Sequence, residues 1–474
     1  MITSTTRTGS WKRSVTLDIK MTTIYSWFFQ RILEPLWEGG IRKRNTLYYE
    51  RQLNESQWRS QEQILKQQWQ DLIRLLTHAE QECPYWQRTF SSLGLKPDNI
   101  HHLDDFRRLP VTTKSTIRNH YDNMVARSWK GKTWKKSTGG STGEPLHFEY
   151  TPESSEWRQA VTRRGYGWAG AKGGVRQAYI WGIPLENEPL LRMAKQKLHH
   201  FFLRQKYFNS FSFDLHAMQR YQKKLQSFKP EVIVGYTNPL YNFSKFLNGQ
   251  GKDSGIHPAS VITAAEALFE HQRSEIEAAF HAPVFHSYGS REFMLIAMEC
   301  EQHEGLHISA ENLLVEVLRE DGSPAAPGEE GRVVITDLHN YGMPFIRYEI
   351  GDMAVLAGQP CSCGRGLPLL KQVTGRILDM ISTPDGRQIP GEYFPHLMKE
   401  FKEIHRFQVI QEDLDSLVIK LVAPEGLPDS ELDRLKAHIR KALGENCNVT
   451  YDLVDDIPLT RTGKHRVTIS HLKS

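Results

Sequence analysis

The middle of the chain alternates short apolar segments with stretches of helical periodicity, and this alternation most restricts the fold. Residues 179–181, 231–234, 261–263 and 283–285 are the apolar segments, and a helix is expected over residues 270–280. Strands separated by helices form βαβ units, in which the strands run parallel and helices cover the sheet. The sequence therefore predicts an α/β domain built around a largely parallel sheet.

From residue 312 onward the pattern changes to strands without helices between them. Segments 313–318 and 332–338 flank a turn-rich stretch at 321–328, which predicts a hairpin. Beyond a turn at 384–387 we expect two strands, a helix and a last strand, over residues 407–410, 417–422, 430–443 and 449–453. This is the pattern of a small α+β domain.

These patterns divide the chain into three parts. We expect a partly disordered N-terminal extension over residues 1–44, a large domain over 45–375 and a small domain over 376–474. Ser60 and Gln63 form a capping box that begins a long amphipathic helix ending near residue 78. Residues 147–150 read as a short strand, and Thr151-Pro152-Glu153 begins the helix that follows.

Composition limits the class of function. With 474 residues, 39% hydrophobic residues and a net charge of +5, the chain is typical of a globular protein. The basic excess fits an anionic ligand but is too small to indicate nucleic acid binding. Five cysteines do not form a disulfide framework, and no apolar run is long enough for a transmembrane helix. The first twenty residues lack the apolar region of a secretion signal, so we expect a cytoplasmic protein.

Residues 24–44 are aromatic at one end and basic at the other. This pattern is compatible with a helix lying in a membrane interface, which would make a peripheral membrane contact. It is also compatible with a helix packed on the protein body, and we favour the packed helix.

The stretch over residues 135–145, Lys-Lys-Ser-Thr-Gly-Gly-Ser-Thr-Gly-Glu-Pro, suits neither a helix nor a strand. Its glycines and hydroxyl side chains favour a loop whose N–H groups close around an anion. A flexible linker is the alternative. The loop is not a P-loop, because Gly143 is followed by Glu144 and Pro145 rather than by lysine and a hydroxyl residue.

Four further stretches carry residues suited to nucleotide chemistry. Ser-Tyr-Gly-Ser-Arg-Glu at 287–292 directly follows a predicted strand, where a glutamate can hold a metal; a solvated turn is the alternative. In Arg-Tyr-Glu-Ile-Gly-Asp at 347–352, a carboxylate after a tight glycine turn suits a ribose diol, although turn aspartates are common. Gly-Arg-Ile-Leu-Asp at 375–379 opens the small domain. Lys464, on a loop at 458–464, would offset charge at a phosphate, or is a solvated surface lysine.

In this order, the five stretches resemble those of the adenylate-forming superfamily, which contains acyl- and aryl-CoA ligases, luciferases and peptide-synthetase adenylation domains. The chain is most similar to the phenylacetate-CoA ligase/CapK branch, which is associated with capsule or exopolysaccharide clusters. The resemblance extends from about residue 45 to the end and includes 48–49, 84–85 and 109–114. It implies a large N-terminal adenylate-forming domain with mixed or parallel sheets, and a small mobile α+β lid domain.

The resemblance also implies roles for single residues. Lys464 would be the catalytic lysine of adenylation and Glu292 would bind Mg²⁺. Tyr288 would lie against adenine, and Asp352 would hold the ribose with help from Arg376. The implied nucleotide-binding residues are Ser137, Thr138, Gly139, Gly140, Ser141, Thr142, Gly143, Glu266, Tyr288, Gly289, Ser290, Arg291, Asp352 and Arg376.

Two positions depart from the superfamily pattern. Arg291 stands where relatives usually have Ser or Thr. Either Arg291 itself would contact phosphate, or Ser290 would take the place of that Ser or Thr. Leu378 occupies the first of two acidic places after the Gly-Arg pair, where many relatives have their hinge residue.

Cysteines and a histidine form a second group. Cys300 and His307 are followed about fifty residues later by Cys361 and Cys363. Thiolates and imidazole are zinc ligands, and four of them complete a closed tetrahedral site; four unrelated buried residues are the alternative. Members of the branch are similar here and some carry zinc, so the resemblance implies a structural zinc that joins residues 300–307 to the loop before the small domain.

The implied function is ATP-dependent activation of a small carboxylic acid through an acyl adenylate, followed by transfer of the acyl group to CoA. One alternative transfers the acyl group to an amine or hydroxyl in capsule or exopolysaccharide biosynthesis. A non-catalytic nucleotide-binding homologue is the alternative from another class. We expect the acyl pocket near Trp181, Gly182, Tyr236, Ala265 and Leu268, whose side chains do not identify the acid.

Overall fold

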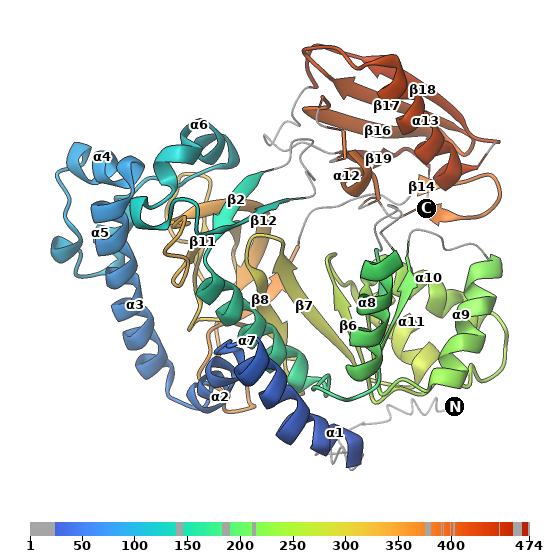
Figure 1. Ribbon diagram of the computed structural model, residues 1–474, viewed down its shortest axis with the longest axis horizontal. Coiled ribbons are helices and arrows are strands. Elements are labelled where there is room, and N and C mark those ends of the chain that lie inside the picture. The colour runs from blue at the N-terminus through green and yellow to red at the C-terminus, as the bar shows by residue number, and fades with distance from the viewer. Residues whose placement is uncertain are drawn as a thin grey trace, which may run out of the picture.

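The computed structural model shows a broad body with a smaller unit at one side (Figure 1). It describes residues 24–472 except for 139–145, 183–189, 211–214, 375–380, 458–466 and residues 390, 392, 399, 402 and 445. The architecture is α/β: a large part with mixed sheets and helices, followed by a small α+β part. The predicted fold class is therefore confirmed.

Helices dominate the first third of the chain. The described elements are α1 (Ile24–Phe28), η1 (Phe29–Leu33), η2 (Leu36–Ile41), α2 (Thr46–Ser56), α3 (Gln61–Glu82), α4 (Pro84–Ser92), η3 (Pro97–Asn99), α5 (Leu103–Arg107), α6 (Lys114–Met124) and η4 (Arg127–Trp129). The predicted capping box is present, because Ser60 accepts from the Gln63 N–H and Gln63 reaches back to the Ser60 N–H. The helix extends one turn beyond the predicted end. A hairpin of β1 (Trp134–Ser137) and β2 (His147–Tyr150) then leads into α7 (Pro152–Trp168).

Eleven of the described strands form one sheet, in the order β10-β11-β12-β13-β9-β8-β7-β6-β5-β3-β4. The parallel part contains β3 (Gln177–Trp181), β4 (Gln205–Asn209), β5 (Val232–Tyr236), β6 (Ser260–Ala264) and the start of β7 (Val284–Ser290). Its helices are α8 (Leu190–Phe202), α9 (Leu215–Phe228), α10 (Thr237–Asn248) and α11 (Glu270–Phe280). The predicted helix over 270–280 and the four predicted strands are present.

The sheet changes from parallel to antiparallel within β7. Val284–His286 pair in parallel with β6, whereas Ser287–Ser290 pair with β8 in the antiparallel sense. The antiparallel strands are β8 (Met294–Glu299), β9 (Leu306–Ile308), β10 (Leu313–Leu318), β11 (Glu330–Asp337), β12 (Tyr348–Leu356) and β13 (Leu369–Val373). The predicted hairpin is β10 with β11.

The small part has its own sheet and core. Its elements are β14 (Ile381–Ser382), β15 (Gln388–Ile389), α12 (Tyr393–Met398), β16 (Arg406–Asp413), β17 (Ser416–Val422), α13 (Asp429–Leu443), β18 (Asn448–Leu453) and β19 (Thr468–Ser470). Four of them pair in the order β18-β17-β16-β19. Tyr236 belongs to the apolar cluster of this core and Trp181 packs against it, so the ends of β5 and β3 touch the small part.

Three buried ion pairs join the helices and strands of the large part. Arg158 of α7 bonds Asp337 at 2.6 Å, and both side chains are almost fully buried. Its neighbour Arg164 bonds Glu311 at 2.6 Å, and Arg347 bonds Glu316 at 3.1 Å. Buried charges need such partners, so the first two pairs fix how α7 lies against the sheet, and the third joins β10 to the residue that precedes β12.

The N-terminal helical segment Ile24–Ile41 packs on the body along one side. The Ser26 hydroxyl donates to the Gly174 carbonyl at 2.9 Å, the Gln30 amide donates to the Gly173 carbonyl at 2.8 Å, and Phe29 is buried. The sequence favoured a helix packed on the protein body. This packing is confirmed for the side of the segment that faces Gly173 and Gly174. Among the described helices, none has the length and apolar composition needed to cross a bilayer.

Candidate active site

The Ser-Tyr-Gly-Ser-Arg-Glu stretch lies where β7 leaves the parallel sheet. It occupies the carboxyl end of β7 and the turn into β8. Gly289 is required for this turn, because a Cβ there would overlap the Met294 carbonyl oxygen of β8. The Ser290 hydroxyl accepts a hydrogen bond from the Phe293 N–H at 3.2 Å and so holds the turn. The carboxyl end of a parallel strand is the usual ligand position in α/β folds.

Two residues of this stretch are bound to β12. The Tyr288 hydroxyl donates to the Asp352 carboxylate at 2.9 Å, and the Tyr348 hydroxyl donates to the Glu292 carboxylate at 3.2 Å. Strands β8, β9 and β13 separate β7 from β12 in the sheet order. The antiparallel part must therefore curl back over β7, which brings the 287–292 and 347–352 stretches together.

Asp352 does not follow a tight turn as predicted. Tyr348–Leu356 are one strand, and Gly351 lies within it at φ +92°. The strand register against β11 shifts at this place, so Gly351 belongs to an irregularity in a strand rather than to a turn. The prediction was wrong about the local structure, while the carboxylate faces Tyr288.

The hairpin β1–β2 carries the glycine-rich loop at its tip. Ser137 pairs with His147, and Thr138 and Leu146 exchange two hydrogen bonds of 2.9 Å at the base of the loop. Gly139, Gly140, Ser141, Thr142 and Gly143 lie outside the described residues. The described stem places the two ends of the loop next to each other.

Positive charge gathers between this stem and the β7 turn. Lys136 of β1 is half-buried, and burial together with the Arg291 and Arg158 guanidinium groups lowers its pKa to about 8; Glu292 acts in the opposite direction. Lys136 and Arg158 also share the Tyr150 ring, at 5.9 and 5.1 Å from its centre.

Two of these cations have nitrogen atoms without a partner. The Nε atoms of Arg291 and Arg158 are buried and make no hydrogen bond in the described part of the chain. Glu292 is the one carboxylate that raises the pKa of Lys136. An anion placed here would reduce the repulsion among the three cations, which makes this a candidate phosphate position.

Glu266 follows the end of β6 and contacts Asn238 at the start of α10. Its carboxylate accepts from the Asn238 N–H at 2.7 Å and from the Asn238 side-chain amide at 3.0 Å. Burial raises the pKa of Glu266 to about 7, although both hydrogen bonds act to lower it. The preceding Ala265 has φ +68°, a left-handed conformation that is costly for a residue with a Cβ. Strain of this kind is common next to functional sites.

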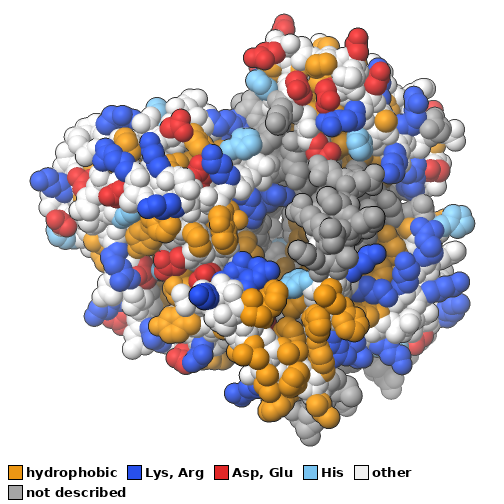
Figure 2. Space-filling model, in the orientation of Figure 1, with side chains coloured by type: hydrophobic (Ala, Val, Ile, Leu, Met, Phe, Trp, Pro, Cys, Tyr) orange, Lys and Arg blue, Asp and Glu red, His pale blue; other side chains and the backbone are white. Residues whose placement is uncertain are grey.

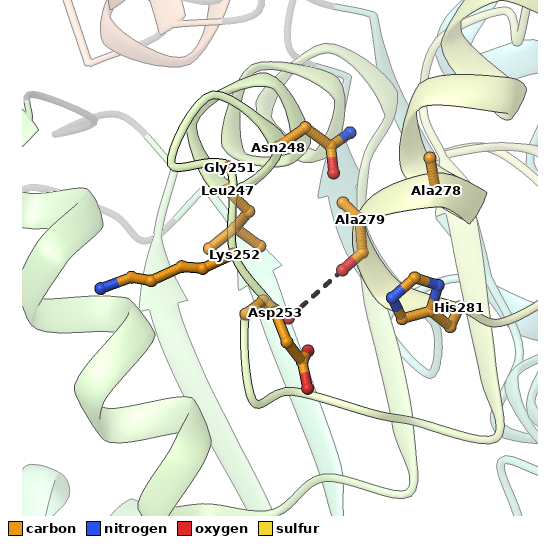
Figure 3. Close-up of a pocket in the computed structure, with 9 residues that line it drawn as sticks. Leu247, Asn248, Gly251, Lys252, Asp253, Ala278, Ala279 and His281 are labelled. Atoms are coloured by element: carbon orange, nitrogen blue, oxygen red, sulfur yellow. Dashed lines mark hydrogen bonds between the residues drawn. The ribbon is translucent and has the colours of Figure 1, made fainter.

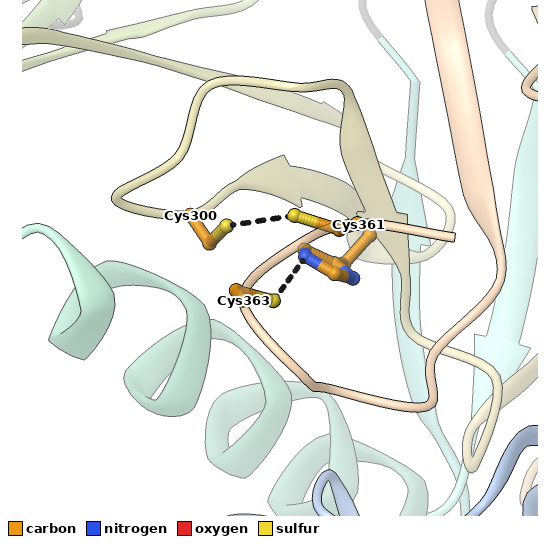
Figure 4. Close-up of side chains that lie close together, drawn as sticks. Cys300, Cys361 and Cys363 are labelled. Atoms are coloured by element: carbon orange, nitrogen blue, oxygen red, sulfur yellow. Dashed lines mark hydrogen bonds between the residues drawn. The ribbon is translucent and has the colours of Figure 1, made fainter. Parts of the chain in front are cut away.

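The cysteine–histidine group is assembled in the structure. Cys300 follows β8, His307 is in β9, and Cys361 and Cys363 lie between β12 and β13. The Cys300 and Cys361 sulfur atoms are 3.6 Å apart, and the Cys363 sulfur is 3.4 Å from His307 Nε2 (Figure 4). All four ligand atoms lie within 4.8 Å of one another.

These spacings fit a tetrahedral zinc ion. Bonds of about 2.3 Å to sulfur and about 2.0 Å to nitrogen give ligand–ligand distances of roughly 3.5 to 3.8 Å. Cys300, His307 and Cys361 are buried, and burial raises the pKa of the Cys300 thiol to about 11. His307 Nδ1 has no hydrogen-bond partner among the described residues. The donor set is therefore complete and suited to a closed structural site.

From the sequence we assigned no role to three residues of the candidate site, and three further residues that we did name lie outside the described part of the chain. Lys136, Arg158 and Tyr348 join the site in the structure. Lys136 and Tyr348 lie within stretches that the sequence analysis singled out, 135–145 and 347–352, whereas Arg158 had no sequence signal. Arg376 and Lys464 lie outside the described residues, as does Leu378.

A separate surface pocket of about 350 Å³ lies between the ends of α10 and α11 (Figure 3). Its lining residues are Leu247, Asn248, Gly251, Lys252, Asp253, Ser254, Ala278, Ala279 and His281. These residues precede β6 and β7, so the pocket lies near the amino ends of these strands, whereas the candidate site lies at their carboxyl ends. None of the predicted site residues lines it.

Comparisons with known proteins show which proteins the chain is similar to. Residues 381–471 match the family model described as the CapK C-terminal domain. Protein CapK of Staphylococcus aureus is 24% identical over 375 residues, covering 78% of this chain and 81% of that protein. The phenylacetate-coenzyme A ligase of Escherichia coli strain K12 is 26% identical over 374 residues, covering 76% and 82%.

A further relative and a solved structure extend the comparison. The phenylacetate-coenzyme A ligase of Thermus thermophilus is 24% identical over 408 residues, covering 80% of this chain and 89% of that protein. The structure of 2-hydroxyisobutyryl-CoA ligase in complex with 2-HIB-AMP and CoA superimposes with a TM-score of 0.55 at 18% identity, covering 86% and 90% of the two chains.

The fold is thus that of the adenylate-forming CoA ligases. Within this class, the chain is similar over most of its length to phenylacetate-coenzyme A ligases and to protein CapK, and its residues 381–471 match the CapK C-terminal domain.

Proposed function

We propose that this protein is an AMP-forming acid ligase. It activates a carboxylic acid with ATP, releases pyrophosphate, and transfers the acyl group of the adenylate to CoA. The observation that carries the proposal is the convergence of Tyr288 with Asp352 and of Glu292 with Tyr348, beside the stem of the glycine-rich loop. Relatives named phenylacetate-coenzyme A ligase, covering most of the chain, support the same reaction class.

These contacts support the following position for the nucleotide. Tyr288 lies against adenine, and Asp352 accepts from the ribose hydroxyls, with Arg376 supporting it. The loop Ser137–Gly143 holds the β- and γ-phosphates. Glu266 lines the edge of the adenine and acyl pockets beyond β6. The adjacency of Tyr288 and Asp352 at 2.9 Å supports this assignment, because adenine and ribose are neighbours in one ligand.

The phosphate end is assigned to the cations near Glu292. Lys136 and Arg291 face a region where their mutual repulsion is relieved by negative charge, which the triphosphate supplies. The buried Glu292 carboxylate is an oxygen donor of the kind Mg²⁺ prefers. When bound there, Mg²⁺ supplies further positive charge at the phosphates.

The chemistry of the first step follows from charge. A carboxylate oxygen of the acid attacks the α-phosphorus, the bond to the pyrophosphate oxygen breaks, and the acyl adenylate forms. Lys464 stabilises the charge that accumulates on the α-phosphate oxygens, and Arg291 and Lys136 stabilise the departing pyrophosphate.

In the second step the CoA thiol, after losing its proton, attacks the acyl carbon. The carbon–oxygen bond to AMP breaks and the thioester forms. We propose that the small domain, residues 376–474, is a lid that moves between the steps and withdraws Lys464. The contact of Trp181 and Tyr236 with the core of the small domain supports this proposal, because both residues belong to the proposed acyl pocket.

We also propose that Cys300, His307, Cys361 and Cys363 hold a structural zinc. The spacing of the four donor atoms supports this assignment. The ion would join β8 and β9 to the loop between β12 and β13, and so help to keep the antiparallel part curled over β7.

The function is tested by two assays on the purified chain with a panel of aryl, fatty and sugar acids. Acid-dependent exchange of pyrophosphate into ATP reports the first step, and formation of an acyl-CoA reports the second. Exchange followed by thioester formation is the expected result. Absence of exchange with every acid would favour a non-catalytic nucleotide-binding protein instead.

The second candidate function shares the first step but passes the acyl group to an amine or hydroxyl. The similarity to protein CapK favours keeping this candidate, and capsule or exopolysaccharide biosynthesis is its proposed setting. Exchange without thioester formation, together with acyl transfer to an amino sugar or a sugar hydroxyl, would select it over the CoA ligase.

A further inference from the structure

The N-terminal helical segment turns a row of large apolar side chains away from the protein. Ile24 is 88% exposed, Leu36 60% and Ile41 69%. The other exposed apolar side chains of the segment are Trp27, Phe28, Ile32 and Trp37. Hydrogen bonds to Gly173 and Gly174 anchor the opposite side of the segment. The exposed apolar face therefore belongs to a helical segment that is attached to the protein body.

A second element extends the apolar face. The Tyr25 hydroxyl donates to the Phe202 carbonyl at 2.6 Å, and the rings of Trp37 and His199 are 6.3 Å apart. The last turn of α8 therefore adjoins the segment, and it adds exposed Leu198, Phe201 (74%) and Phe202. Figure 2 shows apolar side chains gathered at the lower end of this view, where Figure 1 draws α1.

The exposed charges on the segment have one sign. Its two acidic residues are turned inward: Glu34 is buried and bonds Arg163 at 2.8 Å, and Glu38 faces Arg44 at 3.8 Å. The exposed charged residues are Arg31 in the segment and Arg42 and Lys43 directly after it. The Arg42 guanidinium lies 5.0 Å from the centre of the Trp37 ring, so a cation and an aromatic side chain occupy the same outer surface.

Two neighbouring stretches of the chain also have more basic than acidic residues. Among the described side chains at the end of α8, Lys197 is exposed and no acidic residue is present. The 23 residues before Ile24 contain four basic residues and one acidic residue, namely Arg7, Lys12, Arg13, Lys20 and Asp18. An apolar ridge with a basic border is the pattern of helices that lie in the interface of an anionic bilayer.

We propose that the surface formed by Ile24–Ile41 and the end of α8 docks on an anionic lipid bilayer. The apolar side chains enter the boundary between headgroups and acyl chains, and Arg31, Arg42 and Lys43 meet the lipid phosphates. Apolar patches of this size are rarely left in water without a binding role. A second copy of the chain fits less well, because a symmetric contact would bring the like-charged borders together. The proposal is independent of the ligase reaction.

The test is sedimentation of the full chain with vesicles of phosphatidylcholine, with and without phosphatidylglycerol. We expect binding to the anionic vesicles that weakens as salt is raised. The double variant Trp27→Glu/Phe201→Glu should bind at least about tenfold more weakly, because it removes two exposed aromatic side chains that would enter the bilayer. Leu453→Glu is the matched control, since Leu453 is 60% exposed on the small domain and should leave binding unchanged.

A second variant separates charge from apolar contact. Arg31→Glu/Arg42→Glu/Lys43→Glu should lose the preference for anionic over neutral vesicles. If the first variant is poorly folded by circular dichroism, Trp27→Ser/Phe201→Ser replaces it. Failure of the wild-type chain to bind anionic vesicles overturns the proposal. So does a concentration-dependent dimer in light scattering that the Trp27/Phe201 variants abolish, because that result assigns the surface to a second copy.

Discussion

At the scale of single residues, the two adjacent lysines of β1 show how position decides role. Lys135 and Lys136 are chemically identical, but neighbouring strand residues point to opposite sides. The Lys135 side chain is 78% exposed and faces Glu149 at 3.7 Å, whereas Lys136 is half-buried beside Arg291. Only Lys136 is placed to meet a phosphate.

We therefore predict that Lys136→Met weakens ATP binding by about 10- to 100-fold, the loss expected for one charge-assisted hydrogen bond. Lys135→Met should change the dissociation constant less than about threefold. Both constants are measured by titration calorimetry. Because Lys136 is repelled by Arg291 and Arg158, its loss should not lower the melting temperature of the ligand-free protein. Equal effects of the two substitutions would remove Lys136 from the phosphate site.

Glu266 gives a prediction about pH. Its folded-state pKa of about 7 lies above that of an unfolded glutamate, so the protonated carboxyl favours folding. This contribution is complete below about pH 4.5 and is lost as the pH rises through about 7. Its size is at most about 3 kcal/mol, reduced by the partial exposure of the side chain.

Denaturant unfolding of wild type and Glu266→Gln at pH 5 and pH 8 measures this difference. We expect the stability of the wild-type protein to fall between the two pH values by more than that of the variant. At pH 5 we expect Glu266→Gln to be less stable than the wild-type protein, because one Asn238 donor then faces the N–H₂ group of the glutamine. Parallel pH dependences in the two proteins would show that Glu266 does not titrate in this range.

At the scale of elements, the turn between β7 and β8 depends on the absence of a side chain. Gly289→Ala would place a methyl group against the Met294 carbonyl, and the two strands would have to separate. We expect a loss of about 1–3 kcal/mol in the free energy of unfolding, measured with denaturant. Gly167→Ala in α7, where a Cβ meets nothing within 4 Å, is the control and should be neutral or slightly stabilising. A neutral Gly289→Ala would mean that β8 adjusts at no cost.

The proposed zinc group joins the ends of β8 and β9 to the loop between β12 and β13. We predict one equivalent of zinc per chain by elemental analysis, and its loss in Cys361→Ser. The same variant should lose about 4 kcal/mol or more of stability, because a structural metal site is opened. Cys447→Ser is the matched control, since Cys447 is half-buried in the small domain away from the other thiols. Folded wild-type protein that contains no metal would contradict the assignment.

At the scale of the whole molecule, the proposed lid separates the two half-reactions. Lys464→Ala should slow adenylate formation by about 100- to 1000-fold, the usual effect of removing one group that stabilises the transition state. ATP binding and the transfer of a supplied acyl adenylate to CoA should both continue. Lys441→Ala, an exposed lysine of α13, is the control. Loss of both half-reactions in Lys464→Ala would mean that the residue does not act as the lysine of the first step alone.

The sequence by itself determined the elements and the class of chemistry. Apolar segments separated by helices specify the parallel strands β3, β5, β6 and β7, because periodicity is a local property of the chain. The glycine-rich loop and the 287–292 stretch were recognisable because each is a short motif, whereas the Cys/His group was recognised from residue types in two segments about fifty residues apart. Strands β8, β9, β12 and β13 were not predicted, because their buried and exposed positions do not alternate regularly along the sequence.

Tertiary structure alone decided which residues meet. The curl of the antiparallel strands brings Tyr348 to Glu292 and Asp352 to Tyr288, and burial rather than sequence distinguishes Lys136 from Lys135. It also decided that Glu34 and Glu38 turn inward while Arg31, Arg42 and Lys43 remain outside. Except for the Glu38–Arg44 pair, the contacts named here join distant segments of the chain, and local sequence patterns do not encode such contacts.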